Sequence, residues 1–146
     1  MMKSWMVATA VLALPLVGLG GCMTPGSPEL PAYAAKLAPG AGITSSGSGA
    51  GVFTFNPATR ELGYTVTYKD LTGPATMAHI HGPAEPGANA GVVVPFAAAA
   101  SPIVGVATLT EAQAAELIAG KYYVNIHTAA NKGGEIRGQI TQVVMP

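Results

Sequence analysis

Residues 61–69 read Glu-Leu-Gly-Tyr-Thr-Val-Thr-Tyr-Lys, so that large apolar or aromatic side chains alternate with small, polar or charged ones. Successive side chains of a strand point to opposite faces of a sheet, so this period of two predicts an antiparallel strand with one buried face. Segments of similar character flank it on both sides, and the first is expected at a sheet edge. These further strands are expected at 33–37, 52–55, around 79–81, and at 91–96, 103–109, 121–128 and 134–144.

Turns and one helix complete the expected secondary structure. The 19 glycines and 12 prolines among 146 residues are nearly twice the ordinary share, which indicates many turns. Thr110 and Gln113 fit a capping box, residues 111–119 favour a helix, and Gly120 fits its end. Short strands separated by turns, with one short helix, predict an all-β fold: a Greek-key-like antiparallel β-sandwich in which 121–128 and 134–144 form a hairpin.

The N-terminus has the pattern of a targeting segment. Lys3 precedes an apolar run, residues 5–19, and the run ends in Leu-Gly-Gly-Cys at 19–22. A positive start, a short apolar stretch and small residues before a cleavage site are typical of a secretory signal peptide, and this ending resembles the bacterial lipobox. We therefore expect a lipoprotein signal peptide at 1–21 and lipidation of Cys22, the first residue of the mature protein.

This maturation would set the domain organisation and the location. Residues 22–31 are rich in proline and predict a short extended tether, and 32–146 form the globular domain. The residue after the cysteine is Met23 rather than aspartate, which by resemblance favours the outer membrane of a bacterial cell envelope, on its periplasmic or its outer surface. The alternative is an uncleaved membrane helix, because no charged residue lies between positions 3 and 29.

Composition excludes two classes of protein. Only 10% of the residues are charged and the formal net charge is +0, so the chain has no electrostatic footprint for nucleic acid. Cys22 is the only cysteine, so an internal disulfide is impossible, and no serine lies in a nucleophile elbow. Nucleophilic catalysis is therefore not expected, and the membrane is expected as a partner through the lipid on Cys22.

The chain has three histidines, and two of them are His79 and His81 in the segment 77–83. In a strand these two side chains share one face, and His127 shares a face with Asn125 in the same way. If the two strands are neighbours, the three imidazoles converge. Three neutral nitrogens with an open fourth position suit copper or zinc, and the exported setting with no cysteine ligand favours copper slightly.

The alternative to a metal site is that these histidines bond to the backbone and hold the loop 82–91 in place.

If the histidines do bind a metal ion, Asn125 or Glu135 would serve as hydrogen-bond partners of the imidazoles, since a ligating ring usually donates its other N–H to a carbonyl or carboxylate. Glu135 and Arg137 lie two apart, and they are expected to form a polar network that ties down the hairpin, or else a solvated face.

Four segments together resemble the CHRD domain, the repeated domain of chordin, which is common in exported bacterial proteins. They are 78–83 (AHIHGP), 89–93 (NAGVV), 123–128 (YVNIHT) and 134–139 (GEIRGQ). The resemblance runs from about residue 32 to 142 and implies a β-sandwich module without an agreed enzymatic activity. A looser similarity is to copper/zinc superoxide dismutase, but that enzyme uses six histidines, an aspartate and a disulfide, so dismutase activity is not expected.

The sequence thus predicts an envelope-anchored lipoprotein with a CHRD-like binding or structural module and no enzymatic activity. The alternative function is binding of a metal ion, copper before zinc, through His79, His81 and His127. The sequence names no protein partner.

Overall fold

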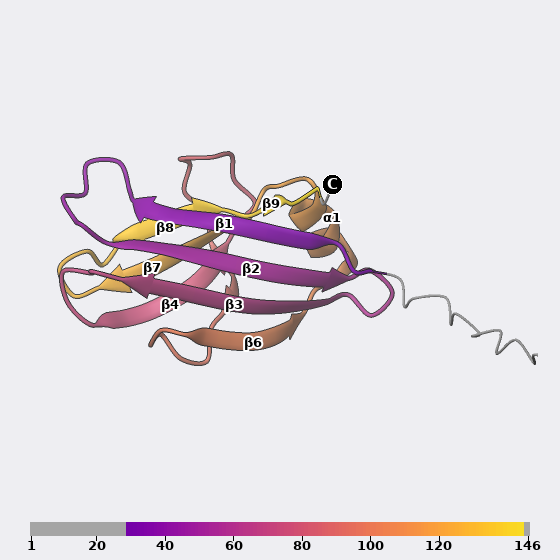
Figure 1. The fold of residues 1–146 in the computed structure, drawn as a ribbon. Coiled ribbons are helices and arrows are strands. Elements are labelled where there is room, and N and C mark those ends of the chain that lie inside the picture. Colours follow the sequence, from indigo (N-terminus) through magenta and orange to yellow (C-terminus); the bar gives the residue numbers. More distant parts are fainter. Residues whose placement is uncertain (1–28, 145–146) are drawn as a thin grey trace, which may run out of the picture.

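The computed structural model describes residues 29–144 (Figure 1). The expected signal peptide, Cys22 and the tether as far as residue 28 lie outside these residues. Within them, no helix has the length and the apolar character needed to cross a bilayer. The elements are β1 (Ala32–Pro39), β2 (Ser48–Asn56), β3 (Glu61–Lys69), β4 (Ala75–His81), β5 (Val92–Pro95), β6 (Ile103–Thr108), α1 (Glu111–Ile118), β7 (Tyr123–Thr128), β8 (Ile136–Gln139) and β9 (Thr141–Gln142).

The strands form two layers that share β1. The order along the hydrogen-bonded path is β5-β4-β7-β8-β1-β2-β3-β6, and every pair is antiparallel. Figure 1 shows β1, β2, β3 and β6 in front of β8, β7 and β4. The chain passes between the layers after β3, after β5 and through α1, which gives the Greek-key-like connectivity. The predicted all-β sandwich with one short helix is confirmed.

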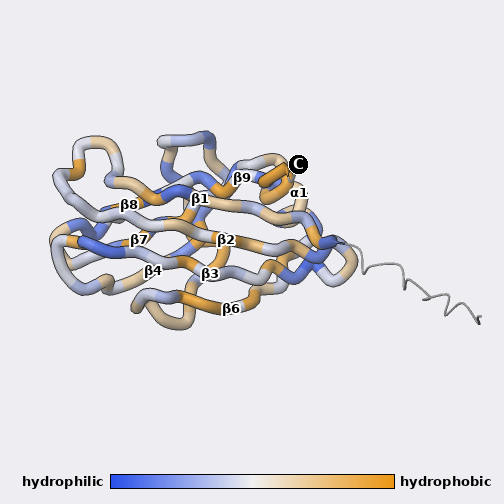
Figure 2. The backbone as a smooth tube through the Cα atoms, in the orientation of Figure 1, coloured by the Kyte–Doolittle hydropathy of each residue, from blue (hydrophilic) through white to orange (hydrophobic). Residues whose placement is uncertain are grey.

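The core lies between the two layers and follows from alternation along the strands. Leu62, Tyr64 and Val66 of β3 point inward and are at most 8% exposed, while the intervening residues face outward. Burial of each large apolar side chain contributes about 1.5–3 kcal/mol, which makes this interface the main source of stability. In Figure 2 apolar stretches stand out along α1 and β6.

The helix closes one end of the sandwich. The Thr110 side chain accepts a hydrogen bond from the Gln113 amide, and the Gln113 side chain accepts one from the Thr110 amide, so the predicted capping box is confirmed. Leu117 is fully buried against the core. The helix delivers the chain to β7, in the centre of the second layer.

Two expectations about strands are wrong. The segment 33–37 belongs to β1, which is not an edge strand, because it pairs with β2 on one side and with β8 and β9 on the other. The segment 134–144 is not one strand. It breaks at Ile140, whose amide donates to the Tyr122 carbonyl oxygen (2.8 Å). Before this point β8 pairs with both β7 and β1, and after it β9 pairs with β1. The expected hairpin of β7 and β8 is confirmed.

Candidate metal centre

The centre of the second layer brings β4 and β7 side by side. His79 lies opposite Asn125, His81 opposite Tyr123, and Met77 opposite His127. Ala78 and Ile80, the residues between, are at most 2% exposed and pack into the core. The histidines therefore all point to the other face of the same layer, as the alternation predicts.

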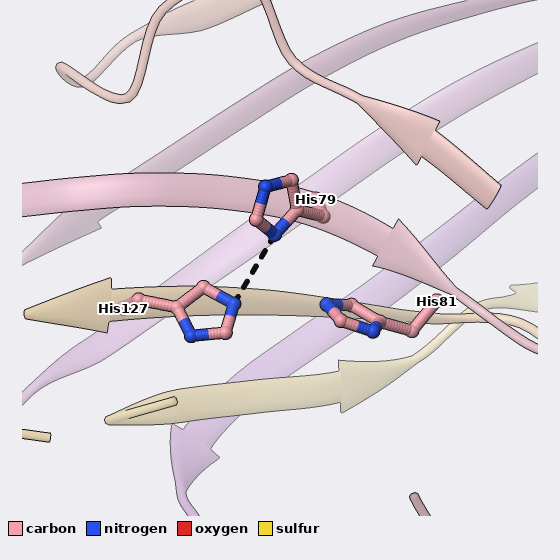
Figure 3. Close-up of side chains that lie close together, drawn as sticks. All are labelled: His79, His81 and His127. Atoms are coloured by element: carbon pink, nitrogen blue, oxygen red, sulfur yellow. Dashed lines mark hydrogen bonds between the residues drawn. The ribbon is translucent and has the colours of Figure 1, made fainter. Parts of the chain in front are cut away.

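The three imidazoles converge on this face (Figure 3). Nδ1 of His79 lies 3.2 Å from Nε2 of His127. The ring centroid of His81 is 5.4 Å from that of His79 and 5.8 Å from that of His127. One nitrogen from each ring lies within 4.8 Å of the others. Three nitrogens at this spacing can contact one ion with small side-chain adjustments.

Backbone carbonyls fix the tautomer of two of the rings. Nδ1 of His81 lies 3.0 Å from the Ala90 oxygen, and Nδ1 of His127 lies 2.9 Å from the Lys132 oxygen. A carbonyl oxygen can only accept, so both Nδ1 atoms carry the hydrogen and both Nε2 atoms carry a lone pair. This is the arrangement that metal-binding histidines use, with the second nitrogen donating to an outer carbonyl. Nε2 of His81 is buried and has no hydrogen-bond partner within the described chain.

Burial and repulsion from neighbouring rings favour the neutral form of His79 and His81. The pKa of His79 is lowered from its ordinary 6.5, first by burial and then by the neighbouring His127 and His81. The pKa of His81 is also lowered, chiefly by burial and further by His127 and Arg137, although the hydrogen bond to the Ala90 carbonyl opposes the shift. Neutral imidazole is the form that binds a metal ion, so these pKa shifts favour the ligating state near neutral pH.

The loop 82–91 contacts the cluster through Ala90, and a stack of rings anchors this end of the loop. The Tyr123 ring stacks on His81 with centroids 5.2 Å apart, and the Arg137 guanidinium lies 3.8 Å from the Tyr123 centroid. The Tyr123 hydroxyl accepts from the Ala90 amide (3.1 Å). Arg137 donates to the Ala88 carbonyl oxygen (2.6 Å) and to Asn89 Oδ1 (2.9 Å). The loop residue that bonds His81 is therefore itself held on both sides.

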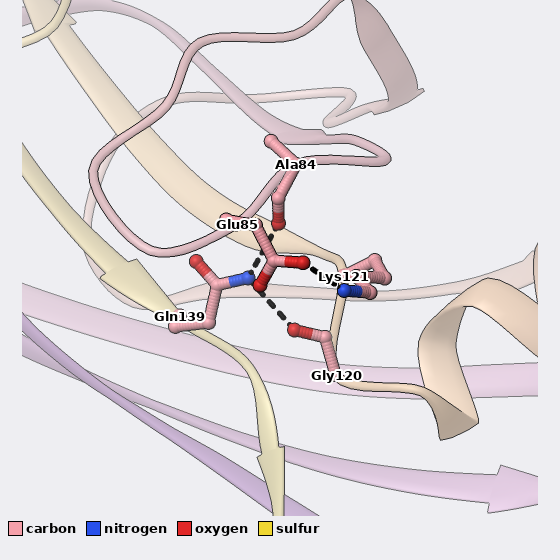
Figure 4. Close-up of polar contacts among 5 residues, drawn as sticks. All are labelled: Ala84, Glu85, Gly120, Lys121 and Gln139. Carbon is pink, nitrogen blue, oxygen red and sulfur yellow. Dashed lines mark hydrogen bonds and ion pairs between the residues drawn. The ribbon is translucent and has the colours of Figure 1, made fainter.

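A second anchor holds the start of the same loop (Figure 4). Nε2 of Gln139 donates to the carbonyl oxygens of Ala84 (3.0 Å) and Gly120 (2.8 Å), so it bridges the loop and the segment after α1. Lys121 and Glu85 form an ion pair beside it. The start of the loop is thus attached to β8 and to residues 120–121, and its end to β7 and β8.

The side chains of Asn125 and Glu135 hydrogen-bond to groups other than the imidazoles. Asn125 is 4% exposed, and its amide donates to the Gly133 carbonyl oxygen (3.0 Å), while its Oδ1 is buried without a hydrogen-bond partner in residues 29–144. Glu135 is fully buried and accepts hydrogen bonds from hydroxyls and amides of three loops, from none of the imidazoles. These donors are Ser45, Thr72, Thr128 and Asn131.

Glu135 thus forms the polar network that ties the hairpin to neighbouring loops. Burial by itself raises the pKa of its carboxyl, but the hydrogen bonds from Ser45, Thr128 and Thr72 outweigh burial and lower it to about 2. The imidazoles receive their support from the Ala90 and Lys132 carbonyls instead. The sequence could not indicate these two carbonyls, because every residue carries one. The position of Tyr123 beside the cluster does follow from the sequence, because alternation places it on the same face as His127.

Comparison with known proteins decides the family. The family model of the CHRD domain matches residues 33–140, which contain β4, β5, β7 and β8 and all three histidines. The chain belongs to the CHRD domain family. The resemblance predicted from the four segments is thereby confirmed, and membership supports a structural or binding module. No curated protein and no solved structure matches this CHRD chain.

Proposed function

We propose that this CHRD domain binds one transition-metal ion through His79, His81 and His127, as a lipid-anchored module of the bacterial cell envelope. The observation that carries the proposal is Nε2 of His81, a buried lone pair with no hydrogen-bond partner in the described chain, beside two more imidazole nitrogens. No enzymatic activity is part of the proposal.

A purely structural role explains less of this arrangement. Holding the loop 82–91 needs only Nδ1 of His81, which bonds the Ala90 carbonyl. Nε2 of His81 then loses its hydration without gaining a hydrogen bond, at a cost of about 1–3 kcal/mol. A bound ion would turn this cost into a coordinate bond. The two tautomers already present the ligating nitrogens, so the rings need not change their outer hydrogen bonds on binding.

The donor set favours copper and then zinc. Imidazole suits both ions, and hard cations such as calcium prefer oxygen ligands that this cluster lacks. Cys22, the only cysteine, is assigned to lipidation, so no thiolate competes for the ion. Copper binds more tightly than zinc to the same nitrogen ligands, which places it first.

Metal titration of the purified chain in detergent micelles tests the site. We expect one equivalent of Cu(II) or Zn(II) to bind, and His79→Ala and His127→Ala each to weaken binding by about tenfold to a hundredfold. Thr67→Ala, at an exposed position of β3 in the other layer, is the matched control and should bind like the wild type. Tight binding that survives both histidine substitutions would refute the three-histidine site.

The anchor is tested separately. Nine residues lie between Cys22 and Ala32, where β1 starts, and the ten Cα–Cα steps that join the two span at most about 35 Å. A lipid on Cys22 would therefore keep the metal centre close to the membrane surface. Mass analysis of the mature N-terminus should find a lipidated Cys22, and processing should stop when lipoprotein signal peptidase is inhibited. An uncleaved, unlipidated chain would restore the membrane-helix alternative.

A further inference from the structure

Met77 lies next to the proposed metal centre without having a structural task there. It precedes His79 by two residues in β4, so both side chains leave the same face of the layer, and its Cα is paired with that of His127 in β7. Its side chain is 51% exposed and is neither in the hydrophobic core nor packed against it. A large apolar side chain on a face of imidazole and amide groups gains little from burial at this position.

The position brings the thioether within reach of the ion. Directly opposite residues of antiparallel strands have Cβ atoms about 4.5–5.5 Å apart, and those two apart on one strand lie about 7 Å apart. A methionine side chain is unbranched and has three rotatable bonds, so its sulfur can cover such a distance toward His79 and His127. His79, the most exposed of the three histidines, is its neighbour, so the sulfur would approach from the open side of the cluster.

The three histidines leave a coordination position to fill. Within residues 29–144 no aspartate or glutamate joins His79, His81 and His127 in the cluster. A tetrahedral ion therefore needs a fourth donor from elsewhere. A thioether is a soft, neutral ligand, and soft sulfur ligands select Cu(I) over zinc and over Cu(II).

We propose that Met77 supplies the fourth ligand of this centre and that the ion held there is Cu(I). This inference rests on the proposed metal-binding function and adds the oxidation state and the ligand that selects it. Zinc and Cu(II) bind through the three imidazoles alone, and only Cu(I) engages the sulfur.

Competition with a chromophoric Cu(I) chelator under reducing, anaerobic conditions tests the inference on the full chain in detergent micelles. Met77→Leu conserves volume at a half-exposed site, so folding should be retained. We expect it to weaken Cu(I) binding by about tenfold or more while Zn(II) affinity stays within about twofold. Val92→Ala is the matched control, because Val92 is also 51% exposed and is paired with His81, yet offers no ligand atom.

X-ray absorption of the Cu(I)-loaded protein gives an independent measurement. A sulfur contribution in the wild type that disappears in Met77→Leu supports the inference. Cu(I) bound with equal affinity by both proteins and without sulfur would refute Met77 as a ligand and leave the three-histidine site intact. Failure of the wild type to bind Zn(II), Cu(II) or Cu(I) would refute the metal centre itself.

Discussion

Replacement of Glu135 by glutamine should remove a large part of the acid sensitivity of this fold. The carboxylate is fully buried, and within residues 29–144 it pairs with no lysine or arginine. Oε1 accepts from the Ser45 hydroxyl (2.5 Å) and the Thr72 amide (2.8 Å), and Oε2 accepts from the hydroxyls of Thr72 (2.6 Å) and Thr128 (2.7 Å). The charge is stabilised by these donors, which come from two loops and the end of β7, far apart in the sequence.

The size of the effect follows from the pKa of Glu135. This pKa is about 2 in the folded protein and 4.5 for an ordinary glutamate, and each unit of difference is worth 1.36 kcal/mol. Ionised Glu135 therefore adds at most about 3 kcal/mol to the free energy of unfolding. Because the folded pKa is the lower one, this contribution is complete above pH 4.5 or so and is lost as the pH falls toward 2. Glu135→Gln should lack it at every pH.

Urea unfolding at a series of pH values measures the difference. Above about pH 5.5 the wild type should be more stable than Glu135→Gln by about 3 kcal/mol, and the gap should shrink to below about 1 kcal/mol near pH 2. Glu61→Gln is the matched control, since Glu61 is exposed and accepts only from the Thr59 hydroxyl. If the gap between wild type and Glu135→Gln stays constant from pH 6 to pH 2, the reasoning is refuted.

Three further substitutions test how the site is held. Arg137→Lys loses the planar fork over the tyrosine ring and should speed amide hydrogen exchange in the loop 82–91, with a cost of about 1–2 kcal/mol; unchanged exchange would contradict this. Gln139→Ala leaves two carbonyls without their donor, and limited proteolysis should cut the same loop faster. Gly138→Ala places a Cβ 2.3 Å from the Lys36 carbonyl oxygen and should lower the free energy of unfolding, measured with urea, by more than about 3 kcal/mol. Gly73→Ala meets no other atom and should change it by less than about 0.5 kcal/mol.

Alternation along the strands predicts which face each histidine occupies, but it does not predict which strands are neighbours. From Met77 to His81 and along β7 the side chains alternate between the two faces, so the face of each histidine follows from its position alone. The adjacency and register of the two strands do not follow, because a slip by one residue would turn every side chain to the other face. The register that places His79 opposite Asn125 depends on the packing of Ile80 and Val124 into the core, and this packing is seen only in the folded structure.

The position of Glu135 has a local cause. It lies two residues before Arg137, so a strand that began at 134 would place both side chains on one face. The chain instead bends at 134–135, with Gly134 at φ +117°, and β8 begins at Ile136. The carboxylate therefore lies on the side of Thr128, while Arg137 faces the loop 82–91. Periodicity carries no information across such a bend.

The backbone carbonyls of Ala90 and Lys132 have two roles, one in the conformation of a loop and one in the tautomer of a histidine. Each fixes the conformation of a loop, and each also decides which nitrogen of a histidine keeps its lone pair. Occupancy of the proposed centre and closure of the loop 82–91 are consequently linked, because an opened loop frees His81 to rotate and change tautomer. Linkage is reciprocal, so an ion that binds the closed form more tightly also stabilises that form by the same free energy. The anchors at Arg137 and Gln139, which touch no imidazole nitrogen, therefore belong to the energetics of the metal site as much as the histidines do.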